Sequence, residues 1–235
     1  MIDAQGIAAL DLRIRFGSIL LLFFAGVLLS FLAWVMCAAY DAPPFARSLI
    51  ALAVSGLSWI WGYQLLAEDR SWISLRARFS TVRTGVLWAC AAGAGALILV
   101  LLVGVKILTW FGIELPELPS SDYSAGGLSW LPAAFLIVGI IAPAAEELMF
   151  RGLVLDWLRQ KTPVWPAIFM SALVFALVHG IALQSGLRGW LQFGYRTAGG
   201  ILMAYLAVRY QSLRPSFVLH ATNNCFAVLA SGFLP

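Results

Sequence analysis

Seven apolar stretches, each of roughly twenty residues, follow one another along this chain. They cover residues 17–40, 48–67, 84–105, 130–155, 164–184, 190–208 and 215–234. An α-helix needs about 20 residues to cross the hydrocarbon core of a bilayer, and the longest stretches lack the polar face of a soluble amphipathic helix. With 62% hydrophobic and 11% charged residues, the sequence predicts an all-α, multi-pass transmembrane helix bundle of about seven helices.

The basic residues are distributed unevenly between the two ends of these predicted helices. If the N-terminus is cytoplasmic, the external loops contain only Arg47 and Arg188. The cytoplasmic loops then contain Arg13, Arg15, Arg70, Arg76, Arg78, Arg83, Arg159, Lys161, Arg209 and Arg214. This bias predicts a cytoplasmic N-terminus and an external C-terminus. The net charge of +4 therefore reflects membrane orientation, and no basic stripe with interleaved aromatic residues predicts a nucleic-acid partner.

The turn-rich segment "LPELPSSDYSAGG" divides the chain into two sets of predicted helices. We expect N-terminal transmembrane helices in residues 1–111, an external loop in 112–129 and a four-helix core in 130–235. The first apolar stretch is long for a cleaved signal peptide, so we expect it to be retained. The short loops, without an organellar targeting or retention signal, favour a bacterial plasma (inner) membrane. Three single cysteines, Cys37, Cys90 and Cys225, predict buried free thiols.

Three ionisable residues interrupt the fourth apolar stretch in the sequence "EELMFR". A charge at the bilayer centre costs at least about 2.5 kcal/mol, so these residues must be paired or used. Glu147 and Arg151 are spaced i, i+4 and can form an ion pair, whereas Glu146 is turned about 100° away. Pro143 lacks an amide hydrogen, which predicts a loosened or restarted helix with Glu146 in its first turn, where the helix dipole favours an anion.

The only two histidines of the chain, His179 and His220, lie in the later apolar stretches. Glu146 and His179 are about equally far from the turn "KTP", so in an antiparallel hairpin they stand at about the same height. His220 and Asn224 are spaced i, i+4 and share one helix face. A glutamate beside a histidine can activate water, and a His–Asn pair can stabilise an oxyanion. These groups predict hydrolysis of an amide within the membrane.

The three motifs resemble a known family. "EELMFR" fits EExxxR, "FALVH" fits FxxxH and "HATNN" fits HxxxN, in the order found in the CPBP family of CaaX proteases and bacteriocin-processing enzymes, also called Abi. The resemblance covers roughly residues 130–232. It implies an intramembrane glutamic-type endopeptidase in which Glu146 and His179 activate water, His220 and Asn224 stabilise the oxyanion, and Glu147 and Arg151 support them.

A metal is the open alternative within this chemistry. The family has been described both as metalloproteases and as metal-free glutamate-dependent proteases. Glu146, His179 and His220 could form a His2Glu zinc site with one open position. We favour the version without a metal, because the chain has no HExxH motif and Asn224 suits an oxyanion donor better than a metal ligand.

Other classes of function are open as well. A non-catalytic bacteriocin-immunity or membrane-binding protein fits the same family, although the complete set of site residues argues against it. A proton-coupled transporter would also place Glu and His in helices, but no inverted repeat is visible in the sequence.

The substrate is expected from the membrane setting and from one further cation. A bacterial membrane favours a membrane-anchored protein or peptide, such as a C-terminal sorting tail, over a prenylated substrate. Arg196, on the predicted helix between the two histidine helices, could bind a carboxylate of that substrate or pair with a carboxylate of the protein. Lys106 is predicted to snorkel from the end of its helix.

Overall fold

The computed structural model describes residues 16–66, 78–113, 128–179 and 186–233, and within these ranges the regular structure is helical. The long helices are α1 (Phe16–Ala39), α2 (Pro44–Leu66), α4 (Thr84–Trp110), a continuous helix over Leu131–Arg159, α8 (Val164–Val178), α9 (Gly186–Tyr210) and α10 (Arg214–Phe233). The predicted all-α bundle of about seven helices is confirmed. Most of the predicted external loop, residues 114–127, lies outside the described residues.

The helix over Leu131–Arg159, here called the motif helix, contains α5 (Leu131–Ala134), α6 (Ala142–Glu146) and α7 (Leu155–Arg159). Wider, π-helical turns over Phe135–Ile141 and Glu147–Val154 join these three α-helical pieces. The helix therefore continues past Pro143 with widened turns, so it is loosened as predicted, and the alternative of a restart with Glu146 in a first turn is wrong. The π-helical turns accommodate the proline without ending the helix.

Among the described residues, four helices are long and apolar enough to cross a bilayer by length and composition, namely α1, α2, α4 and the motif helix. The helix α8 has 15 residues and ends at Val178, so it is shorter than the predicted stretch over 164–184. The helices α9 and α10 have 25 and 20 residues, but they are richer in polar side chains. Those polar side chains are the ones that the site below uses.

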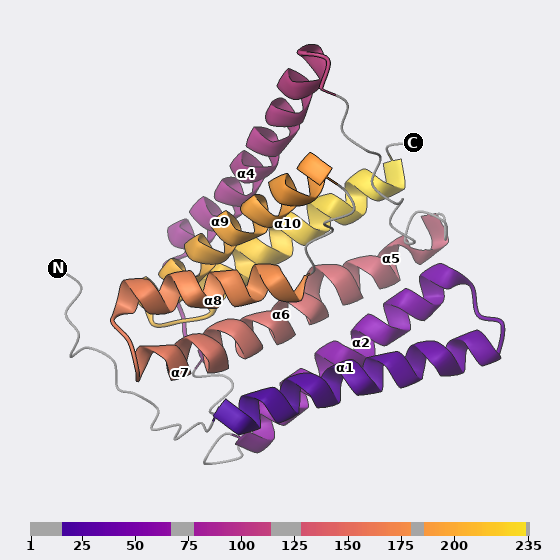
Figure 1. Ribbon diagram of the computed structural model, residues 1–235, viewed down its shortest axis with the longest axis horizontal. Coiled ribbons are helices and arrows are strands. Elements are labelled where there is room, and N and C mark those ends of the chain that lie inside the picture. Colours follow the sequence, from indigo (N-terminus) through magenta and orange to yellow (C-terminus); the bar gives the residue numbers. More distant parts are fainter. Residues whose placement is uncertain (1–15, 67–77, 114–127, 180–185, 234–235) are drawn as a thin grey trace.

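The motif helix occupies the middle of the bundle, because α2 packs on one side of it and α10 on another (Figure 1). The helices α1 and α2 form an antiparallel hairpin, and α8 packs along α9. The helix α4 packs against α10 through its N-terminal half, where Cys90 and Ala94 are buried, and its C-terminal half leans away from the bundle. All three cysteines are free, as predicted, but only Cys90 is buried, whereas Cys37 and Cys225 are half-buried.

Contacts between distant segments show which helix ends lie together. At one end Phe16 stacks on Trp157, and Arg78 pairs with Asp156 at 2.6 Å. The Ser212 hydroxyl donates to the carbonyl of Ser80 at the same end. At the other end Phe45 packs edge-on against Trp130. The chain therefore runs up and down through the bundle in consecutive helices.

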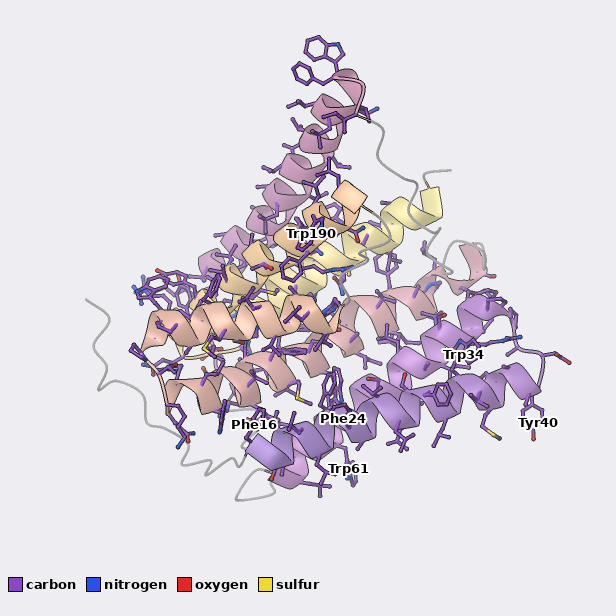
Figure 2. The ribbon with its side chains drawn as sticks, in the orientation of Figure 1. Phe16, Phe24, Trp34, Tyr40, Trp61 and Trp190 are labelled. Atoms are coloured by element: carbon purple, nitrogen blue, oxygen red, sulfur yellow. The ribbon has the colours of Figure 1, made fainter. Side chains whose placement is uncertain are left out.

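The outer faces of the N-terminal helices are apolar and exposed. Figure 2 shows Trp61 and Tyr40 pointing away from the bundle, and their side chains are among the most exposed large residues of α1, α2 and the turn that joins them. An exposed apolar surface of this extent is unfavourable in water and suits contact with lipid. The packing thus agrees with the membrane setting that the composition predicts.

Candidate active site

The site begins with an ion pair that is sealed inside the bundle. Arg151 Nη1 lies 3.1 Å from Glu147 Oε1, and both side chains are fully buried. The guanidinium stands over the ring of Phe175, 4.4 Å from its centre, and Arg151 Nη2 donates to the carbonyl of Gly200 at 3.5 Å. The predicted i, i+4 pair is confirmed. Because burial of either charge alone is strongly unfavourable, each member is required for the other.

His220 extends this ion pair toward the second glutamate. Its Nδ1 lies 2.9 Å from Glu147 Oε1, so the imidazole donates Nδ1–H to the carboxylate. Its Nε2, on the opposite edge of the ring, lies 3.5 Å from Glu146 Oε2. The sequence predicted Glu147 only as a partner of Arg151, whereas the structure makes it a partner of His220 as well. The two adjacent glutamates thus contact opposite nitrogens of one ring.

Glu146 also faces His179, as the hairpin geometry predicts. Glu146 Oε2 lies 3.5 Å from His179 Nε2, and this oxygen is buried without a hydrogen-bond partner among the described residues. Glu146 is the point at which the two histidines meet. The arrangement brings residues from three helices, the motif helix, α8 and α10, to one carboxylate oxygen.

The tautomer of the neutral His179 ring is determined by the hydrogen bond that its Nδ1 makes. His179 Nδ1 lies 2.8 Å from the carbonyl oxygen of Phe175. A carbonyl only accepts hydrogen bonds, so Nδ1 carries the hydrogen and the neutral ring presents an Nε2 lone pair to Glu146. His179 is the residue directly after α8 rather than part of a longer span, and 29% of its side chain is exposed. The site is therefore open at His179 and closed at Glu147.

Asn224 shares the face of α10 that carries His220 and also contacts the motif helix. Its Nδ2 donates to the carbonyl of Val138 at 3.0 Å. The second N–H of the amide remains for another acceptor. No contact joins Asn224 to Glu146 or His179 in the described part of the chain, so its oxyanion role stays a prediction.

Arg196 lies at the open side of the site. Its Nη1 donates to the carbonyl of His179 at 3.3 Å, and the side chain is partly exposed. Arg196 thereby binds the residue that directly follows α8, a contact that the sequence did not predict. The remaining donors of the guanidinium are available to a substrate or to solvent.

Two further polar residues were missed by sequence reasoning. The Tyr195 hydroxyl donates to Asn223 Oδ1, and Asn223 Nδ2 donates to Asn224 Oδ1 at 3.4 Å. No sequence motif singles out Tyr195, whereas Asn223 is adjacent to a motif residue and could have been suspected from that position.

A metal would need convergent ligands. Among the residues that the structure describes, no group of three or more His, Cys, Asp or Glu side chains has the geometry to hold a metal ion. Glu146, His179 and His220 as placed here do not form such a group, so we derive no step through a metal. The metal-free reaction stays a prediction, with zinc as its alternative.

Comparison with known protein families finds a match to the segment that carries these contacts. Residues 128–226 match the family model for "Type II CAAX prenyl endopeptidase Rce1-like". All the residues of the three motifs fall inside this segment. No solved structure matches the chain.

Two curated relatives come from Bacillus subtilis (strain 168). The uncharacterized protein YyaK is 28% identical over 128 residues, which are 54% of this chain and 42% of that protein. The putative membrane peptidase YdiL is 26% identical over 149 residues, which are 63% of this chain and 57% of that protein. The matched region thus spans about half the length of each relative. Over residues 128–226, the chain is thus similar to the type II CAAX prenyl endopeptidase Rce1-like family.

Proposed function

We propose that this protein is an intramembrane endopeptidase that hydrolyses a peptide bond in a membrane-anchored protein or peptide. The observation that carries the proposal is the position of Glu146 Oε2, 3.5 Å from the Nε2 atoms of both His179 and His220. The family-model match over residues 128–226 and a relative named as a putative membrane peptidase support the same reaction class. A buried carboxylate between two imidazoles is suited to hold a water molecule and remove its proton.

The reaction divides between the two histidines. Glu146 and His179 accept a proton from water, whose oxygen attacks the carbonyl carbon of the scissile bond. The His179 lone pair at Nε2, left free by the Nδ1–H bond to Phe175, supports its role as a base. The tetrahedral intermediate collapses when the amide nitrogen takes up the proton and the C–N bond breaks. The products are a carboxylate and an amine.

His220 is the complementary donor. To donate from Nε2 to the oxyanion while Nδ1–H faces Glu147, the ring must carry both hydrogens. The free N–H of Asn224 is the second donor. Removal of one such donor typically slows acyl transfer by about 10² to 10³.

The experiment compares two neutralised carboxylates in cells that lack the native gene. Glu146→Gln removes the site carboxylate, whereas Asp41→Asn makes the same charge change on the exposed turn between α1 and α2. New N-termini of membrane proteins are then quantified by labelling and mass spectrometry. We expect at least one membrane protein to remain uncut with Glu146→Gln and to be cut with Asp41→Asn, at equal protein levels.

Identical N-termini in both strains would overturn the proposed protease activity and favour the non-catalytic binding or immunity protein.

The zinc content of the purified protein is measured alongside this comparison. Stoichiometric zinc in purified active protein, with loss of activity on chelation, would refute the metal-free reaction.

The proposed setting is a bacterial inner membrane with the N-terminus in the cytoplasm. The end of the bundle that carries Arg78, Arg159 and Lys161 is the basic one, which supports its placement in the cytoplasm. Reporter fusions at Ala42 and Gln160 should fall on opposite sides of the membrane, with Gln160 inside. The reverse order would refute this orientation, and the same side for both would refute the alternation of the helices.

A further inference from the structure

The hydrogen-bond pattern of the motif helix leaves the carbonyl of Val138 without the backbone donor expected for it. In the π-helical turn over Phe135–Ile141, hydrogen bonds run from each N–H to the carbonyl five residues before it, and the N–H of Ala142 accordingly binds Ile137. The next N–H in this pattern would come from residue 143 and bind Val138. Residue 143 is a proline, which has no N–H.

A side chain from another helix fills this gap. Asn224 Nδ2 donates to the Val138 carbonyl at 3.0 Å. A partly buried carbonyl without a donor is unfavourable, so the proline creates a binding position that one side chain of α10 satisfies. The motif helix and α10 pack closely beside this contact, because a Cβ added to the neighbouring Gly139 would come within 2.6 Å of Cys225 Sγ.

The same contact determines how the Asn224 amide is oriented. A carbonyl accepts only, so the amide must turn its nitrogen toward Val138 and its oxygen the other way. That oxygen accepts from Asn223 Nδ2 at 3.4 Å, and the Asn223 oxygen in turn accepts from the Tyr195 hydroxyl. This series of hydrogen bonds begins at the Val138 carbonyl, which Pro143 leaves without a backbone donor. It continues through Asn224 and Asn223 to Tyr195.

From this hydrogen-bond chain we infer that Pro143 is a positioning residue, which acts through Asn224. By removing one backbone donor, it binds the Asn224 amide to the motif helix, in the turns just before Glu146, and directs the amide nitrogen to that side. Tyr195 and Asn223 hold the amide oxygen from α9 and α10. The role of Asn224 in catalysis rests on the proposed function, whereas the bond between the two helices does not.

The first test measures thermal unfolding in detergent and needs no substrate. Its four proteins are the wild type, Pro143→Ala, Asn224→Ala and the double variant. Asn224→Ala leaves the Val138 carbonyl unpaired, so we expect the unfolding temperature to fall by about 2 to 6 °C. In the Pro143→Ala background the restored backbone N–H supplies the donor, so there Asn224→Ala should lower the temperature by less than half as much.

The matched control is Pro132→Ala, which lies in the first turn of the same helix, where a missing N–H frees no carbonyl. In that background Asn224→Ala should have its full effect. An equal fall in the Pro143→Ala and Pro132→Ala backgrounds would overturn the inference. Asn224→Asp, which keeps the shape and loses the donor, serves as a second probe if the alanine variant does not fold.

The second test measures proteolysis of the substrate found with Glu146→Gln. Pro143→Ala introduces a better helix former but leaves a small gap at a fully buried position, so its unfolding temperature should stay near that of the wild type. Its maximal rate should nevertheless fall about 10- to 100-fold with an unchanged KM, since the oxyanion donor is no longer held. A purely structural proline would change stability and activity in the same direction, and full activity would overturn the positioning role. If Glu146→Gln itself has no effect, the proposed function fails while the unfolding cycle remains interpretable.

Discussion

The helix α4 and the motif helix are similar in sequence terms but differ in where they lie. They have 27 and 29 residues, and their mean hydropathies are 2.5 and 1.8. Yet only 12% of an apolar 18-residue stretch of α4 is buried, against 50% of the corresponding stretch of the motif helix. Trp88 and Val100 of α4 are largely exposed, whereas Glu147 and Arg151 of the motif helix are sealed inside the bundle. In a membrane protein, hydropathy therefore does not separate the lipid-facing helix from the central one. A few ionisable residues do, because lipid excludes them.

The largest expected effect contrasts His179 with Trp88. Removing a general base typically slows a reaction by about 10² to 10⁴, so His179→Ala should lose nearly all proteolysis. Because His179 is partly exposed at the end of α8, the unfolding temperature should change little. Trp88→Ala removes a larger, 73% exposed side chain from α4 and should leave the rate unchanged. Equal losses in the two variants would break the distinction between core and periphery.

The second contrast removes one cation from each helix. Arg151→Met leaves Glu147 buried without its guanidinium, which should lower the free energy of unfolding by about 3 to 5 kcal/mol. Lys106→Met on the exposed surface of α4 should change it by less than about 0.5 kcal/mol. Detergent denaturation curves measure both. A mild effect of Arg151→Met would mean that the ion pair is not closed to water.

The third contrast concerns glycines of α9 and α4. A Cβ on Gly200 would approach the backbone of Ala172 in α8 to 3.1 Å, whereas a Cβ on Gly95 of α4 would meet nothing within 4 Å. Gly200→Ala should therefore destabilise the protein by about 1 to 3 kcal/mol through overpacking. Gly95→Ala should be neutral or stabilising by about 0.5 to 1 kcal/mol. Stabilisation by both substitutions would show that α8 and α9 can separate freely.

The smallest expected effect is at Arg196. If its free donors bind a substrate carboxylate, Arg196→Ala should raise KM about tenfold and leave kcat nearly unchanged, the pattern of lost uniform binding. Steady-state kinetics with the substrate found by the Glu146→Gln comparison measures this. Loss of folded protein would assign Arg196 to the support of α8 through the carbonyl of His179. A fall in kcat alone would instead mean that this contact positions His179.

Several features could be predicted from the sequence because they depend on local spacing. The approximate extents of most helices followed from the lengths of the apolar runs, and the pair Glu147–Arg151 followed from the i, i+4 spacing. The meeting of Glu146 and His179 followed from equal distances to one turn. Such rules work within a helix or a hairpin, where geometry is fixed by the rise per residue.

Other features depend on how the helices pack, which no local spacing specifies. The contact of His220 with both glutamates, the Arg196 bond to the end of α8 and the chain from Tyr195 to Asn224 each join residues of different helices. The end of α8 at Val178 was also missed, because apolar residues continue beyond it. The hydropathy of a segment indicates whether its surroundings are apolar, but it does not indicate the backbone conformation of the segment.

Pro143 shows most clearly the difference between what the sequence determines and what the packing of the helices decides. The sequence alone determined that one backbone donor is missing beside the glutamates, and it therefore predicted a loosened or restarted helix. Only the tertiary structure decided the outcome, since α10 brings Asn224 to the Val138 carbonyl and the motif helix continues through π-helical turns. The physical reason is that a hydrogen-bond donor missing from the backbone can be replaced from any neighbouring element, and which element is near is a property of the packed bundle.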